Sequence, residues 1–286
     1  MANLEVILKI SVAVFMLGNL LDMGLRVDLS RALVGLKQTR FVGAILLWGF
    51  VALPALAWLL ARVLPIENAH ATGLVLLGMA PVAPFLPPMV ERARGNLDLA
   101  AAVLLVASIG IVIYMPLAVP FLVPGLDTSV AAIARPLLLF LLLPLALGIA
   151  IQRAAPGLAA RLHPVVKAAT GADTLLMLAL CVMVYGKGFL TLAGSWVIGA
   201  QLVFFAAATL LPWLIGLGLG RDERVVLSLS MATRNLGSAF APLFALPVPE
   251  RQAIVTVALG VLMQAGFSYA AATWFAARAP ERSVRP

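Results

Sequence analysis

Hydrophobic residues dominate this chain in long runs that short polar or basic connections separate. A helix needs roughly 20 apolar residues to cross the hydrocarbon core of a membrane. We expect nine such helices, at about residues 5–24, 41–64, 69–90, 97–122, 132–152, 164–190, 195–219, 225–246 and 252–277. No hydrophilic stretch is long enough for a separate domain, so the pattern predicts one all-α polytopic membrane domain over residues 1–286.

Two of these runs contain residues that a continuous membrane helix does not tolerate. Pro81, Pro84, Pro87 and Pro88 remove four amide donors from the third run, which must therefore be broken near its middle. The eighth run carries a cluster of Ser, Thr, Arg, Asn and Gly over residues 228–238. Polar groups at membrane depth require partners or a cavity, so this run is also predicted to be interrupted.

The two interrupted runs occupy matching positions in two halves of the chain. Each is followed by one long uninterrupted run, 97–122 or 252–277. The third and eighth spans cross the membrane in opposite orientations, as an inverted repeat requires. We therefore predict an inverted-repeat secondary transporter with repeats at about 5–122 and 132–277, and with its ligand site at the breaks.

Composition and charge place the chain in a lipid bilayer. Its 286 residues are 63% hydrophobic and 11% charged, whereas a soluble domain has about 25% charged residues. Of the twenty Lys and Arg residues, fourteen fall on one face of the nine predicted spans, five on the other, and Arg234 within a span. The net charge of +8 therefore reflects topology and not nucleic-acid binding. The positive-inside rule predicts an outside N-terminus and a cytoplasmic C-terminus, in a plasma (inner) membrane.

Several short motifs, in their order along the chain, resemble the bile acid:sodium symporter family. They are Pro54-Ala55-Leu56-Ala57-Trp58-Leu59, Ala80-Pro81, Ala93-Arg94-Gly95-Asn96, Leu143-Pro144-Leu145-Ala146-Leu147-Gly148 and Arg234-Asn235-x-Gly237. The resemblance implies a panel of helices 5–24, 132–152 and 164–190 and a core of helices 41–122 and 195–277. It further implies that the two broken helices cross in the core, and that the core moves against the panel during transport.

The positions that bind sodium in family members carry different residues here. By the resemblance they are Gly49, Leu86, Pro87, Ala100, Leu104, Ser230 and Arg234. Sodium requires oxygen ligands, and this set offers mainly apolar carbon and a fixed cation that repels it in a low dielectric. We therefore expect no sodium coupling, no metal and no cofactor, with a proton gradient or facilitated diffusion as the alternative.

Arg234 is open to two compatible interpretations. Its guanidinium can bind carbonyls at the ends of the half-helices and so replace the missing sodium, or it can bind a carboxylate or sulfonate of the substrate. The predicted substrate-binding residues are Arg234, Asn235, Thr233, Ser238, Pro84 and Gln264. Asn235 is also expected to serve as a backbone partner at the break.

Three further polar residues are candidates for coupling or gating. Asp173 lies inside the run 164–190 and could be a proton site, because intramembrane acids are costly; the alternative is a local hydrogen bond near the interface. Asp22 is expected to pair with the basic stretch 26–40, or else to act in gating. Asn19 stands near the same end of the first run.

The sequence favours transport over catalysis or signalling. No paired acids and no Ser-His arrangement occur within the spans, and no soluble output domain is attached. We expect a secondary transporter that moves small organic anions, such as bile-acid-like carboxylates or sulfonates, by alternating access. A passive facilitator, an exporter of another solute and a membrane sensor remain alternatives, and neither the substrate nor the oligomeric state is assigned.

Overall fold

A computed structural model describes residues 2–27, 29–123, 129–192, 194–244, 246 and 250–279. Within these residues the chain is helical and contains no strand. The α-helices are α1 (Ala2–Arg26), α2 (Leu29–Leu36), α3 (Thr39–Leu47), α4 (Leu53–Val63), α5 (Asn68–Gly78), α6 (Leu86–Arg92), α7 (Leu97–Leu122), α8 (Val130–Leu137), α9 (Leu143–Ala154), α10 (Pro156–Thr191), α11 (Val197–Ile215), α12 (Arg221–Ala232), α13 (Leu236–Phe244) and α14 (Arg251–Ala277). The described part of the chain is thus all-helical, as the hydrophobic pattern predicts.

Seven helical stretches in the described part are long and apolar enough to cross a membrane. They are Asn3–Arg26, Thr39–Val63, Leu97–Leu122, Val130–Ala154, Pro156–Leu190, Val197–Ile215 and Arg251–Ala277. The other two expected spans correspond to pairs of shorter helices, α5 with α6 and α12 with α13. The protein is therefore an integral membrane protein, while the count of nine spans and the inverted repeat stay predictions.

Two of the long spans contain a π-helical segment that ends two residues before a proline. Segment η1 (Trp48–Ala52) precedes Pro54, and η2 (Leu138–Leu142) precedes Pro144. A proline lacks an amide hydrogen and its ring crowds the preceding turn, so the helix widens there instead of breaking. Each of these two spans therefore carries a local π-bulge and continues past its proline as a helix.

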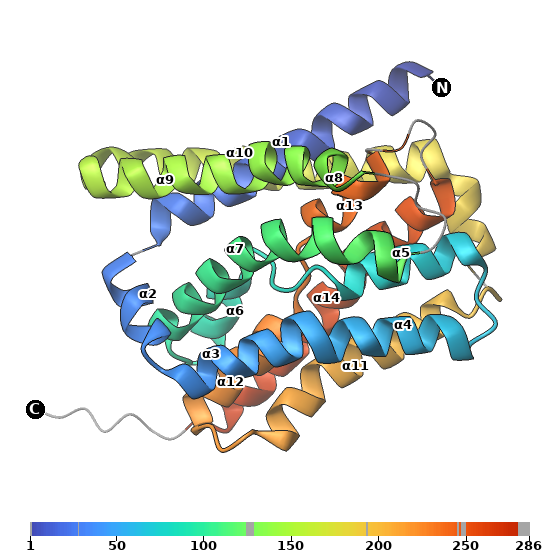
Figure 1. Cartoon of the computed structure of the whole chain (residues 1–286). Helices are drawn as coiled ribbons and strands as arrows, with labels where there is room; N and C mark the ends of the chain where they lie inside the picture. Colours follow the sequence, from blue (N-terminus) through green and yellow to red (C-terminus); the bar gives the residue numbers. More distant parts are fainter. Residues whose placement is uncertain are drawn as a thin grey trace, which may run out of the picture.

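The helices form two groups, which Figure 1 shows one above the other. Helices α1, α9 and α10 pack against one another, and we call them, with α8, the panel. Small residues allow the closest approach: a Cβ added to Gly24 of α1 would lie 2.5 Å from the carbonyl oxygen of Leu145 in α9. The other group, which we call the core, includes α4, α5, α11, α12 and α14. Helix α13 contacts both groups, through α1 and α8 of the panel and through α5 and α14 of the core.

Candidate functional site at the crossing of two broken helices

The first break separates α5 from α6 and is produced by the prolines. Pro81 and Pro84 lie between the two helices, whereas Pro87 and Pro88 occupy the first turn of α6. A helix tolerates proline in its first turn because the amide there has no partner within the helix. Val82 adopts a φ of +64°, which is a genuine outlier for a β-branched residue. The backbone of this break is therefore held in place by its surroundings.

The second break separates α12 from α13 and is produced by polar residues. Helix α12 ends at Ala232, and Thr233 follows in an extended conformation. Asn235 then caps α13, because its Oδ1 accepts the amide hydrogen of Ser238 at 3.2 Å. A Cβ added to Gly237 would lie 2.5 Å from Cγ of Met16, so glycine permits the close approach of α1.

The two breaks meet at their centres through an antiparallel bridge between Pro81 and Arg234. Three hydrogen bonds join them. They are Val82 N–H to Thr233 O (3.1 Å), Asn235 N–H to Ala80 O (2.9 Å) and Ala83 N–H to Thr233 Oγ1 (3.2 Å). Backbone groups that leave a helix at membrane depth need such partners. The structure thus places Arg234 at the crossing of the broken helices, where the sequence predicts it.

The guanidinium of Arg234 is enclosed within the core. Arg234 has no exposed surface, and its Nη2 donates to Met231 O at 2.6 Å while Nη1 lies 3.4 Å from Gly78 O. These carbonyls stand at the C-terminal ends of α12 and α5, where the helix dipole is negative. The ring of Phe204 in α11 lies 5.2 Å from Cζ. Among the described residues no carboxylate pairs with this charge, so carbonyl dipoles and an aromatic face balance it.

A cavity of about 270 Å³ lies beside the crossing, between the panel and the core. Five predicted residues line it: Asn19, Pro84, Arg234, Asn235 and Gln264. The sequence did not single out Phe15 and Met16 of α1 or Thr174 of α10, which complete its panel side together with Leu20 and Gly171. The cavity thus brings together residues that are far apart in the chain.

The polar lining of this cavity consists mainly of neutral amides. The amide oxygen of Gln264 accepts the backbone N–H of Arg234 at 2.6 Å, and that of Asn235 accepts from Ser238. Each side chain therefore keeps its NH₂ group as a donor for a ligand. The guanidinium contacts Gly78, Met231 and Phe204, none of which lines the cavity. Its two terminal nitrogens are consequently directed into the core, while its Nε has no hydrogen-bond partner among the described residues.

Two of the residues predicted to bind the substrate form hydrogen bonds with backbone groups instead. Thr233 Oγ1 accepts from Ala83 and donates to Ser230 O at 3.0 Å, and Ser238 Oγ donates to Asn235 O at 2.8 Å. Neither residue lines the cavity. Hydroxyls near a helix terminus readily bond to the local backbone, which accounts for this placement.

The two predicted coupling acids lie within the panel and do not line the cavity. Asp173 Oδ1 accepts from Ser11 of α1 at 2.8 Å, so it joins α10 to α1. Asp22 binds Arg26 at 2.8 Å and His163 at 2.5 Å, and thus pairs with the basic stretch as expected. The contact with His163 was not expected, because it joins helices that are distant in the sequence.

A second cavity, of about 360 Å³, lies further along the same two panel helices. Arg26 of α1 and His163 and Lys167 of α10 line it, opposite Glu91 of α6. Basic groups therefore outnumber acids in its lining. An anion that enters the seam between panel and core from this end meets a favourable field.

The residues that the resemblance assigns to sodium positions form a donor set that does not fit sodium. Leu86, Ala100 and Leu104 are buried apolar side chains, and Ser230 Oγ donates to Val226 O. Gly49 lies against the crossing, since a Cβ added there would lie 3.2 Å from Pro81, but as a glycine it offers no side-chain ligand. The guanidinium of Arg234 supplies a positive charge at the ends of the half-helices. This donor set is unsuited to a cation.

Broken helices that cross beside a buried cavity define a class of membrane protein in which irregular backbone forms a solute site. Within that class, the sequence model of the sodium bile acid symporter family matches residues 13–193. The chain therefore belongs to this family, whose members are transporters and not enzymes. The matched range contains the first break and ends before the second. No curated protein was found to match the chain.

Proposed function

We propose that this protein is a secondary transporter that carries a small organic anion by alternating access and without sodium. The observation that carries the proposal is the guanidinium of Arg234, which sits between the carbonyl ends of α5 and α12 beside a solute-sized cavity. A cation is needed there to balance two negative helix ends. Arg234 supplies that cation permanently, so no ion has to bind with the substrate.

The lining of the cavity favours an amphipathic anion. Its walls include Phe15, Met16 and Phe85, and its polar donors are the NH₂ groups of Asn235 and Gln264. Hydrogen bonds from neutral donors to a carboxylate or sulfonate are stronger than those to a neutral acceptor. The volume of about 270 Å³ limits the solute to a small molecule or to part of a larger one.

Contacts at the two ends of the panel–core seam support a transport cycle. At the Glu5 end, Arg251 of α14 lies 3.5 Å from Glu5 of α1, and a Cβ on Gly188 of α10 would lie 3.0 Å from Val255. At the Arg26 end, the second cavity opens between the same two groups of helices. We assign this arrangement to a state that is closed at the outer end, in a protein of nine spans with inverted repeats, an outside N-terminus and a plasma-membrane location.

The proposal is tested by ligand binding to the purified protein in detergent. A bile acid, an aliphatic carboxylate and an alkyl sulfonate are added in sodium chloride and in choline chloride, and the melting temperature is measured. We expect at least one anion to raise the melting temperature equally in both salts. A rise that requires sodium would overturn the sodium-independent mechanism. A lack of response to every anion, with a response to neutral or cationic solutes, would overturn the substrate class.

The variant that tests the cavity is Gln264→Leu, which removes a cavity donor at similar volume and also removes the acceptor of the Arg234 backbone N–H, so its melting temperature is measured first. If the anion occupies the cavity, this variant should bind it about tenfold more weakly, which is the effect of one charge-assisted hydrogen bond. Counterflow in proteoliposomes then distinguishes transport from binding alone. Binding that is unchanged in the variant would place the anion elsewhere.

A further inference from the structure

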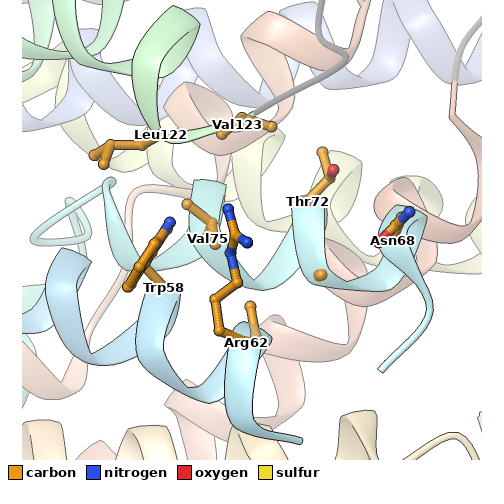
Figure 2. A pocket seen from close by; sticks show the side chains of 9 residues that line it. Trp58, Arg62, Asn68, Thr72, Val75, Leu122 and Val123 are labelled. Carbon is orange, nitrogen blue, oxygen red and sulfur yellow. The ribbon is translucent and has the colours of Figure 1, made fainter. Parts of the chain in front are cut away.

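A pocket of about 280 Å³ lies at the junction of α4, α5 and the end of α7, and shares no lining residue with the crossing cavity. Figure 2 shows the Arg62 side chain extending from α4, beside Trp58, toward Val75 of α5. Asn68 and Thr72 line the pocket from α5. The proposed transport mechanism makes no use of this pocket.

Arg62 differs from Arg234 in how its charge is balanced. Its Cζ lies 5.0 Å from the ring of Trp58, which is the only interaction of its guanidinium within the described part of the chain. Glu67, five residues further on, accepts instead from Nε2 of Gln252 at 3.0 Å. The five guanidinium donors therefore remain available, and the indole face holds the side chain in its orientation.

The other polar groups of the pocket are also available to a ligand. The side chains of Trp58, Asn68 and Thr72 make no hydrogen bond to any residue that the structure describes. Asn68 and Thr72 are four residues apart on α5, so they lie on the same face of the helix. Indole and guanidinium groups can only donate, and no acid lines the pocket. Asn68 and Thr72 can donate as well as accept, so the pocket gathers donors around one positive charge, and an anion suits it best.

The position of the pocket indicates where such an anion comes from. Arg62 stands in the last turn of the apolar stretch Thr39–Val63, at the depth where arginine and tryptophan meet lipid headgroups. Beside the donors lie the apolar side chains of Val75, Leu122 and Val123. A polar half and an apolar half thus meet in one pocket.

We infer that this pocket binds the phosphate of an anionic phospholipid, with Arg62 as the charged ligand and the adjoining acyl chain against the apolar wall. A free phosphate shares the headgroup chemistry but would gain nothing from that wall. The site is independent of the proposed transport mechanism, because none of its residues lines the crossing cavity.

Native mass spectrometry of the full-length protein in detergent tests the inference. Phosphatidylglycerol, phosphatidylcholine and inorganic phosphate are added separately to the wild type, Arg62→Gln and Thr72→Val. The matched control is Arg135→Gln, which removes an exposed arginine that does not line the pocket. We expect retention of one phosphatidylglycerol in preference to phosphatidylcholine. Its apparent Kd should rise about tenfold in Arg62→Gln, less in Thr72→Val and not in Arg135→Gln.

The other outcomes separate the sources of the anion. Inorganic phosphate that binds as tightly as phosphatidylglycerol, and with the same dependence on Arg62, would overturn the lipid as ligand. Equal losses in Arg62→Gln and Arg135→Gln would show an unspecific effect of charge and overturn the site. Melting temperatures of the lipid-free variants show whether each variant is folded. If Arg62→Gln does not fold, Thr72→Val still tests the site.

Discussion

The two breaks are produced by different residues but satisfy each other's backbone groups. The first is made by prolines; it accepts through Ala80 O and, from the end of α5, Gly78 O, and it donates through the amides of Val82 and Ala83. The second is made by polar residues; it accepts through the carbonyl and hydroxyl oxygens of Thr233, and it donates through the amide of Asn235 and the guanidinium of Arg234. Each break therefore supplies hydrogen-bond partners to the backbone of the other. The difference between them is charge: the guanidinium of Arg234, in the second break, is the charged donor at the carbonyl ends of α5 and α12, where it takes the place of an added ion.

The largest expected effect comes from removing that donor. Arg234→Gln leaves the carbonyls of Gly78 and Met231 buried without their charged partner, and should lower the free energy of unfolding by about 3 kcal/mol. Arg234→Lys keeps the charge, so its free energy of unfolding should fall by less. Thermal unfolding in detergent measures both, with the exposed Arg251→Gln as control.

The same variants distinguish the two roles considered for Arg234. If the guanidinium only stabilises the crossing, Arg234→Gln protein that remains folded should bind an anionic ligand as tightly as the wild type. If the guanidinium contacts the substrate, Arg234→Gln should abolish binding and Arg234→Lys should weaken it, with both proteins still folded. The burial of the guanidinium against Phe204 supports the first outcome.

A smaller loss should follow from Phe204→Leu. This change removes the aromatic face over the guanidinium and part of a fully buried side chain, so we expect a cost of about 2 kcal/mol. In the Arg234→Gln background the cation–π part of this cost should vanish. A double-mutant cycle from the four melting curves measures the coupling, and additive effects would contradict the contact.

The hydroxyl of Thr233 tests the hydrogen bonds between the breaks. Thr233→Val keeps the shape of the side chain and leaves the amide of Ala83 without an acceptor, so it should cost about 1 kcal/mol. Ligand affinity should be unchanged, because Thr233 does not line the cavity. A variant with wild-type stability and weaker binding would restore Thr233 as a ligand.

The smallest effect is expected at Ser238. Its hydroxyl bonds only to the carbonyl of Asn235 in its own helix turn, so Ser238→Ala should change stability by about 0.5 kcal/mol or less. Isothermal titration with an anion identified in the binding screen should give the wild-type Kd. A clear loss of affinity would show that the side chain reaches the substrate in another state of the protein.

The sequence predicted the breaks because their causes are local. Prolines and a cluster of polar residues interrupt a helix wherever the rest of the chain lies, so Pro84 and Arg234 could be located in advance. The partners of these residues could not be found in this way. Phe204 is one of many apolar residues in α11, and His163 meets Asp22 only through the packing of α10 on α1.

The direction of the Arg234 side chain also depends on packing. The sequence left open whether its guanidinium faces the substrate or the helix ends, because either arrangement provides partners for a buried charge. Thr233 and Ser238 were predicted as ligands from their nearness to the break, but near a helix end the backbone competes for the same hydroxyls. Local chemistry identified the polar groups, and the three-dimensional arrangement decided their partners.

Arg234 contacts the ends of two helices and the face of a third, which has a consequence for how fast the backbone exchanges its amide hydrogens. An interrupted helix is usually a weak point that opens readily to water. Here residues 225–243 are buried, and the amides of Val82 and Asn235 are bonded across the crossing. Deuterium should therefore enter the irregular centre of the protein more slowly than the ends of its regular helices.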